Sequence, residues 1–191
     1  MVKIVRAAAL VASVLAVGTA SATSTRHYNI WRRLHRPLHI PRLAAGAPCP
    51  TTAPRPAPRP FVGTTFGPGP AFPGGIQENG RPVLRYQDPI PVDSTAYGSG
   101  WFGNKTLWYA PRYREAVLIR GRQLDGQNAL RFSFGFETGT PRRLELHLRA
   151  QTPTTGLTSS TRVRAPGCYG YQIDGRRFSY VIVFEAKPYA P

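Results

Sequence analysis

The chain is poor in acidic residues, sulfur-containing residues and long apolar runs. Its 191 residues include nine Asp and Glu against 25 Lys and Arg, which gives a net charge of +16, and it has two cysteines and one methionine. The single methionine, Met1, and the four scattered histidines exclude the Met and His clusters that copper carriers use. No apolar stretch reaches the roughly 20 residues that span a bilayer. We therefore expect no transmembrane span once a signal peptide is removed.

Sequence motifs of known chemistry are also missing. There is no nucleophile elbow, zinc signature, calcium loop or phosphate-binding glycine loop. His147 alternates with leucines, which places it on an exposed strand face. The acidic residues are scattered, and Asp125 and Asp174 each precede a glycine in a turn signal. We expect no enzyme activity, catalytic residue, metal or cofactor.

The first 22 residues have the order of a secretory signal peptide. Lys3 and Arg6 precede an apolar run over 7–17, and small residues follow as far as Ala22. An uncleaved membrane anchor is the alternative, but this apolar run is too short to span a bilayer. We interpret 1–22 as a signal peptide, which predicts a secreted or extracellular protein and leaves association with the cell surface open.

Two cysteines in an exported chain indicate a disulfide. An oxidising compartment favours the pairing of Cys49 with Cys168. A reactive thiol would need a base nearby, and a metal site would need three or four ligands at regular spacing. The alternation of Tyr169, Tyr171 and Ile173 places Cys168 on the opposite, outer face of its strand. The bridge would then pin the region around Cys49 against the outside of the domain.

Two regions of unusual composition follow the signal peptide. Residues 23–48 are basic, with apolar residues from Trp31 onward at helical spacing, but prolines prevent a long helix. We expect a disordered basic arm, and the alternative is a segment that lies on an anionic membrane or wall surface. Residues 49–75 are rich in proline and glycine, which predicts an extended linker without a core of its own. This linker would act as a spacer or lie along its folded neighbour.

Residues 76–191 have the pattern of an all-β domain. Apolar and polar residues alternate at 130–137 and 144–150, as in strands with one buried face. Asp174 and Gly175 form a two-residue hairpin signal between the last two predicted strands. The expected strands lie at 81–86, 105–110, 115–121, 130–137, 144–150, 159–165, 168–173 and 177–186.

Seven to eight short strands predict an immunoglobulin-like antiparallel β-sandwich preceded by a disordered or extended N-terminal region. A small barrel of the same length is the alternative. We expect the protein to be a monomer. We also expect Trp108 to be buried, as large aromatic residues in strands usually are. The expected centre of the core is formed by Phe132, Phe134, Leu146, Tyr180, Ile182 and Phe184.

Three stretches resemble a group of uncharacterised secreted bacterial immunoglobulin-like β-sandwich proteins, mostly from high-GC organisms. They are GNKTLWYAPRYREAVLIRGRQLDG, SSTRVRAPGCYGYQIDG and FSYVIVFEA. The shared features are an Arg-Gln-Leu-Asp-Gly turn and a Pro-Gly-Cys-aromatic start of the terminal hairpin, and the likeness covers about residues 98–186. The resemblance implies an exported sandwich and transfers no activity or site residue.

Arginine dominates the basic residues, since only Lys3, Lys105 and Lys187 are lysine. Arginine binds carboxylates and phosphates through two parallel hydrogen bonds, although a GC-rich genome produces the same bias. Neighbouring strands would align several arginines into one basic sheet face that binds an anionic envelope polymer or a protein partner. The alternative is a solvated surface without a ligand. The arginines of this predicted face are Arg120, Arg122, Arg131, Arg149, Arg162 and Arg164.

A different function would follow from the aromatic segment GSGWFGNKTLWYAPRY. If Trp101, Phe102 and Tyr109 were exposed, they could stack on sugar rings, as in a carbohydrate-binding module. We expect no specific nucleic-acid recognition, because no recognition helix is evident.

Overall fold

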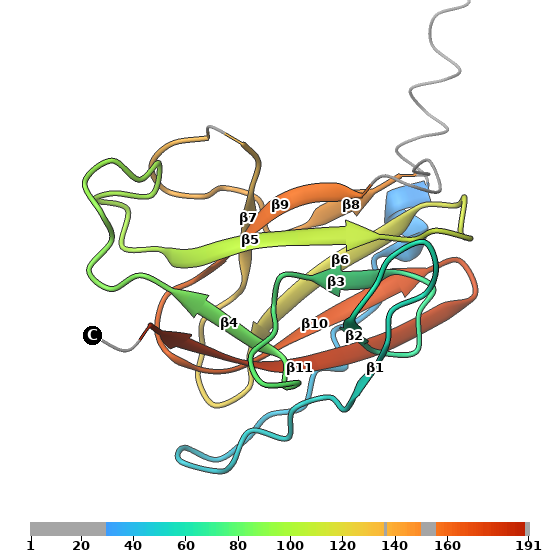
Figure 1. Cartoon of the computed structure of the whole chain (residues 1–191), viewed down its shortest axis with the longest axis horizontal. Coiled ribbons are helices and arrows are strands. Elements are labelled where there is room, and N and C mark those ends of the chain that lie inside the picture. The colour runs from blue at the N-terminus through green and yellow to red at the C-terminus, as the bar shows by residue number, and fades with distance from the viewer. Residues whose placement is uncertain (1–29, 136, 150–155, 190–191) are drawn as a thin grey trace, which may run out of the picture.

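The described residues form a β-sandwich of two facing sheets (Figure 1). The computed structural model describes residues 30–135, 137–149 and 156–189, so the expected signal peptide lies outside the described residues. The prediction of an all-β fold is confirmed. In chain order the strands are β1 (Pro54–Pro56), β2 (Thr64–Phe66), β3 (Phe72–Gly74), β4 (Val83–Tyr86), β5 (Phe102–Tyr109), β6 (Val117–Gln123), β7 (Arg131–Ser133), β8 (Leu146–Leu148), β9 (Leu157–Val163), β10 (Gly167–Gly175) and β11 (Phe178–Pro188).

The order of the strands is that of an immunoglobulin-like domain. One sheet has the order β3-β5-β9-β7 and the other β4-β11-β10-β6-β8, while β1 and β2 form a separate two-stranded ribbon. Immunoglobulin domains have the order A-B-E-D in one sheet and C-F-G in the other. Here β3, β5, β9 and β7 take the first four positions, and β6, β10 and β11 take the other three. β8 extends the second sheet beside β6.

One pair of strands departs from the antiparallel expectation. β4 runs parallel to β11, with Val83 opposite Glu185. Because β3 pairs with β5 in the facing sheet, the chain passes from one sheet to the other between β3 and β4. Gly75 lies at this passage with a φ of +81°, and a Cβ there would lie 2.9 Å from the carbonyl oxygen of Lys105. The crossing therefore requires glycine at this position.

The core between the sheets is largely aromatic. Trp108 is completely buried, as predicted, and its ring meets Tyr171 edge-on with centroids 5.0 Å apart. Tyr171 also stacks on Phe184 at 4.5 Å. The predicted core residues all belong to this cluster: Phe132, Leu146, Ile182 and Phe184 are buried, and Phe134 and Tyr180 are partly buried.

The hydroxyl group of Tyr169 closes the turn between the two sheets. Tyr169 lies near the start of β10 and donates its O–H to the carbonyl oxygen of Ala165, at 2.9 Å. A tyrosine bonded to the backbone a few residues upstream is typical of the same corner in immunoglobulin domains. Burial raises the pKa of Tyr169 to about 12, and burial likewise raises that of Tyr86 to about 12.

Three strand details differ from the sequence prediction. The strands expected at 130–137 and 144–150 shorten to the three residues of β7 and of β8, and Leu144 is exposed. The hairpin between β10 and β11 is confirmed, but its turn lies at 176–177 instead of Asp174-Gly175. Gly175 is the last residue of β10 and pairs with Phe178, whose ring occupies the place of a Cβ at this glycine.

The proline-rich region 49–75 is part of the sandwich and not a linker without a core. β3 belongs to the four-stranded sheet, and Phe66 and Ala71 are buried in the main core. The Thr65 hydroxyl donates to the carbonyl oxygen of Pro73 at 3.1 Å. The prediction was wrong because these few apolar side chains fill core space that the later strands leave open.

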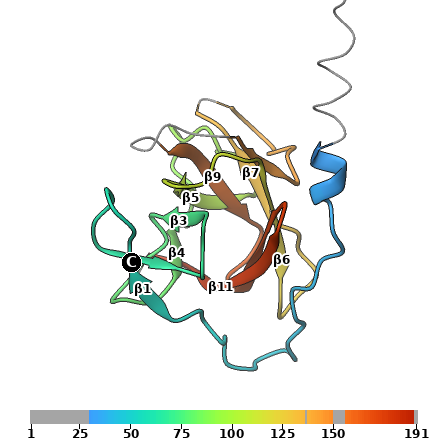
Figure 2. The same cartoon turned by 90° about the vertical axis from the view of Figure 1, so that its right-hand side faces the viewer.

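Residues 30–48 are also ordered, contrary to the prediction of a disordered arm. A helical turn at 30–34 leads into an extended segment that runs along the outer face of the five-stranded sheet (Figure 2). Ile40 is buried there, and the backbone N–H of Leu43 donates to the carbonyl oxygen of Leu124 at 2.8 Å. We call residues 30–52 the arm. No helix within the described ranges has the length and hydropathy to cross a membrane.

The predicted disulfide between Cys49 and Cys168 is confirmed and fastens the arm. The two Cα atoms lie 5.4 Å apart and the residues are 119 positions apart in the sequence. Cys168 is on the outer face of β10, as predicted, yet it is only 1% exposed because the arm covers it. With Ile40, Leu124 and Val183 it forms a second, smaller apolar cluster.

Removal of the disulfide should strongly destabilise the chain. Closing a loop of this length lowers the entropy of the unfolded state, which corresponds to about 4 to 5 kcal/mol in the chain-entropy model. We expect a loss of this size in urea unfolding of the double variant Cys49→Ala/Cys168→Ala. An unchanged free energy of unfolding would show that the bridge does not contribute to the folded domain.

Alkaline pH should destabilise the fold through its buried tyrosines. Tyr86 and Tyr169 keep their protons up to about pH 12 in the folded chain, but lose them near pH 10 in the unfolded chain. The two tyrosines therefore contribute fully to the free energy of unfolding below pH 10, and this contribution is lost as the pH rises toward 12. Spectrophotometric titration should show these phenols ionising together with unfolding, and early ionisation of all tyrosines in the folded chain would contradict this.

Candidate anion-binding site

The six arginines predicted to form one basic face lie on two different sheets. Two are on β6, beneath the arm, and three are at or next to β7 and β9 in the facing sheet. Arg149 follows β8 and lies over the ring of Trp31, with 5.9 Å between the guanidinium carbon and the ring centroid. The prediction of one face was wrong because alternation identifies the polar side of each strand but not the sheet to which the strand belongs.

Arg120 is a structural residue and not part of an open surface. It is 6% exposed, and its Nη2 lies 2.9 Å from Oδ2 of the fully buried Asp174. The same guanidinium donates to the carbonyl oxygen of Arg36 in the arm at 2.5 Å. A buried ion pair of this kind is stable only when further hydrogen bonds satisfy both groups.

Those further hydrogen bonds come from β10, β11 and the arm. Ser179 donates its hydroxyl to Oδ1 of Asp174 at 2.6 Å. The side-chain amide of Gln172 donates to Asp174 at 3.0 Å and to the carbonyl oxygen of Pro37 at 2.9 Å. The backbone N–H of His39 donates back to Oε1 of Gln172 at 2.6 Å. This network joins the arm to the outer face of the sheet.

Arg122 also holds the arm. It donates to the carbonyl oxygen of Ile40. Burial lowers the pKa of Arg122, and the nearby charge of Arg42 lowers it further. The two predicted site residues on β6 therefore bind this chain's own backbone.

Two of the remaining three arginines lie over Trp101, and the third lies beside them. Arg131 on β7 lies opposite Arg162 on β9. The guanidinium carbons of Arg131 and Arg164 lie 5.2 and 5.0 Å from the centroid of the Trp101 ring, which is within cation–π range. We call Trp101, Arg131, Arg162 and Arg164 the arginine–tryptophan cluster. It brings together residues that the sequence assigned to two alternative sites.

Within the described residues, the arginines of this cluster, Arg131, Arg162 and Arg164, form no ion pair with a carboxylate. Arg162 is largely buried, donates from Nε to the Ser133 hydroxyl at 3.1 Å, and has a pKa that burial lowers. A guanidinium that has lost water without gaining a carboxylate favours an added anion.

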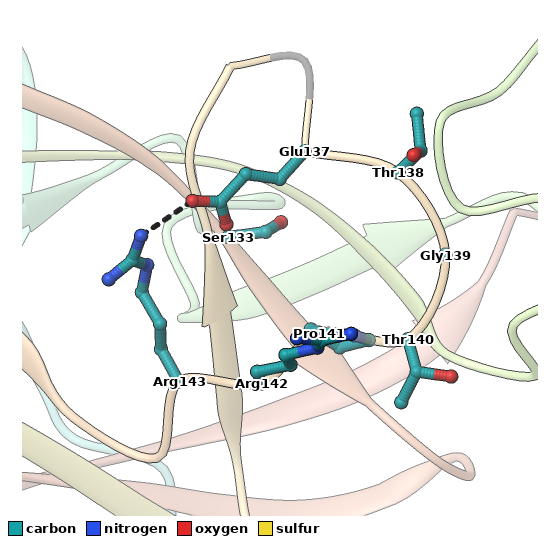
Figure 3. Close-up of a pocket in the computed structure, with 8 residues that line it drawn as sticks. All are labelled: Ser133, Glu137, Thr138, Gly139, Thr140, Pro141, Arg142 and Arg143. Atoms are coloured by element: carbon teal, nitrogen blue, oxygen red, sulfur yellow. Dashed lines mark hydrogen bonds and ion pairs between the residues drawn. The ribbon is translucent and has the colours of Figure 1, made fainter.

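A pocket of about 440 Å³ adjoins the cluster and is enclosed by the loop 137–143 (Figure 3). The side chains of Glu137 and Arg143 point toward one another, with an oxygen and a nitrogen 2.7 Å apart. The Arg143 hydrogen bond lowers the pKa of Glu137. Arg131 donates to the carbonyl oxygen of Pro141 at 3.1 Å, which ties the cluster to the pocket wall. The lining residues are Ser133, Glu137, Thr138, Gly139, Thr140, Pro141, Arg142 and Arg143.

The pocket and the cluster together present donors for an oxyanion. Ser133 lines the pocket and also accepts the hydrogen bond from Arg162, so it joins the two parts. Threonine hydroxyls and the exposed Arg142 complete the rim. Hydroxyl and guanidinium groups are suited to phosphate, sulfate or carboxylate. Among the described residues, no three His, Cys, Asp or Glu side chains gather as a metal ion would need.

None of the pocket residues was predicted from the sequence as a site residue. Arg142 and Arg143 follow a Thr-Gly-Thr-Pro turn, and this basic pair at a turn was the available signal. It was not recognised because the strand predicted at 130–137 extended over the beginning of the loop.

The expectation of exposed aromatics for sugar stacking was wrong. Trp101 is 6% exposed and Tyr109 is 3% exposed. Arginine side chains cover Trp101, and the ring of Phe61 covers Tyr109 at a centroid distance of 4.1 Å. Phe102 is partly buried and stacks on Tyr86 at 4.9 Å. These rings pack within the protein and offer no open platform.

Breaking the buried ion pair between Arg120 and Asp174 should destabilise the domain. In Asp174→Ala, the guanidinium of Arg120 loses its carboxylate while it remains covered, so we expect a loss of about 3 to 5 kcal/mol in the free energy of unfolding. Glu137→Ala is the matched control, because it breaks an exposed pair that contributes at most about 1 kcal/mol. Equal effects of the two substitutions in urea unfolding would contradict the structural role of Asp174.

Comparisons of this chain with protein-family models, with curated proteins and with solved structures find no match.

Proposed function

We propose that this chain is a non-enzymatic binding module, secreted or held at the cell surface, that binds anionic polymers of the cell envelope. Its binding site is the arginine–tryptophan cluster with the adjoining pocket. One observation carries the proposal: Arg131 and Arg164 lie over the Trp101 ring, Arg162 lies opposite Arg131, and within the described residues none of the three forms an ion pair with a carboxylate. An external anion would supply the missing partner.

The exposure of the arginines fits a polymeric ligand. Arg142 and Arg164 are exposed, so a flexible chain can reach them first. Arg131 and Arg162 are more deeply set and held by hydrogen bonds, so their guanidinium groups have fixed directions. A polymer with an anionic group on each repeat would bridge the exposed and the deeper arginines, and each guanidinium can bind two oxygens at once.

Two features support the proposal that the protein acts outside the cytoplasm. The bond between Cys49 and Cys168 is of a kind that persists in oxidising compartments. The order of charged, apolar and small residues in 1–22 is that of a secretory signal.

Polyanion binding should depend on salt and on the arginines of this site. We expect polyphosphate, measured by titration calorimetry, to bind more weakly as the salt concentration rises, because counterion release drives such binding. In Arg142→Gln/Arg164→Gln, affinity at constant salt should fall about tenfold, which corresponds to about 1.4 kcal/mol.

The matched control is Arg59→Gln/Arg81→Gln, which removes the same charge at exposed positions outside the site. We expect its affinity to stay close to that of the unchanged protein. An equal loss in the two double variants would show attraction by net charge alone and would overturn the proposed site, as would binding that is insensitive to salt.

A further inference from the structure

A second cavity lies where the arm meets the sandwich. The helical turn at 30–34 packs at one end of the sandwich, away from the loop 137–143 (Figure 1). Between this turn and the segment that leads into β6 is a cavity of about 740 Å³. Ligand sites for small molecules have volumes of this order. The cavity shares no lining residue with the pocket at 137–143.

One wall of the cavity is apolar and held in place. Ile30, Trp31 and Leu34 of the helical turn line it. Leu34 is buried, and the Trp31 ring stacks on His147 with centroids 4.0 Å apart and planes 14° apart. Because these contacts fix the turn against β8, the apolar wall is formed before any ligand binds.

The rest of the lining is positively charged. The cavity is lined by four arginines and a single acidic residue, Glu115. The pairing of Glu115 with Arg176 is long, at 3.8 Å, and exposed. Exposed pairs of this kind contribute little energy, so Glu115 does not offset the charges of both Arg33 and Arg176. The arginines are Arg33, Arg114, Arg149 and Arg176.

An apolar wall beside a cationic rim selects a ligand that has both characters. We infer that this cavity binds a single-chain anionic amphiphile, such as a fatty acid or an alkyl phosphate. Its hydrocarbon chain lies against Ile30 and Trp31, and its anionic group lies between Arg33 and Arg176. A hydrophilic polymer would leave the apolar wall unfilled, and a neutral amphiphile would leave the cationic rim without a partner. The inference does not depend on the proposed polymer site.

The test is titration calorimetry of the full chain with dodecyl phosphate below its critical micelle concentration. We expect saturable binding of one molecule per chain. Affinity should fall about tenfold or more in Arg33→Gln/Arg176→Gln, since each 1.4 kcal/mol of lost interaction corresponds to a factor of ten. It should also fall in Ile30→Asn, which places a polar amide in the apolar wall.

Arg142→Gln/Arg164→Gln is the matched control, because it removes the same charge at the polymer site and should leave dodecyl phosphate binding unchanged. Thermal unfolding of each variant must match that of the unchanged chain. Three results would each overturn the inference. The first is equal affinity for the neutral dodecyl maltoside, and the second is binding to phosphatidylglycerol vesicles without binding to monomeric dodecyl phosphate. The third is an equal loss of affinity in the control variant.

Discussion

The stability of the domain depends on the cover that the arm places over the outer face of β10 and β6. That face carries Arg120, Gln172 and Asp174, which are buried polar groups. If this face were exposed, water would form hydrogen bonds with these groups. Because the arm covers the face, other protein groups must supply those hydrogen bonds and ion pairs. Backbone groups of residues 36–39 supply several of these hydrogen bonds, and the Cys49–Cys168 bridge holds the following segment in place. The N-terminal extension is therefore a third layer of the fold.

The small number of carboxylates, and the places where they are used, decide which basic residues have no acidic partner inside the fold. The few carboxylates serve mainly as internal ties: Asp174 pairs with Arg120, and Glu78 bridges Arg85 and Lys187. The hydrogen bond from Arg85 lowers the pKa of Glu78, so this tie is ionised at neutral pH. Nine acidic residues cannot pair one to one with 25 basic ones, so the chain carries an excess of positive charge. The arginine–tryptophan cluster is the place where this excess is concentrated and partly buried.

The sandwich could be predicted from the sequence because alternation is a local signal of each strand. Tyr169, Tyr171 and Ile173 point into the core as their spacing indicates, and the outward direction of Cys168 follows from the same pattern. The cluster could not be predicted, because Arg131 and Arg164 meet at Trp101 only through the order of strands in the sheet. Likewise, no local pattern distinguishes a disordered basic arm from one whose carbonyl oxygens accept hydrogen bonds from Arg122 and Arg120, which lie 82 and 84 positions away in the sequence.

Net charge cannot by itself select a ligand for this protein, since a chain with so few acids attracts any anion. Selection must come from the groups that accompany the arginines. Beside the cluster these are hydroxyl groups such as that of Ser133, which can bind only groups that carry hydrogen-bonding atoms. At the helical turn they are Ile30 and Trp31, which gain energy only by covering hydrocarbon. The two proposed sites would therefore bind different ligands without competing, because they differ in shape and polarity although both are basic.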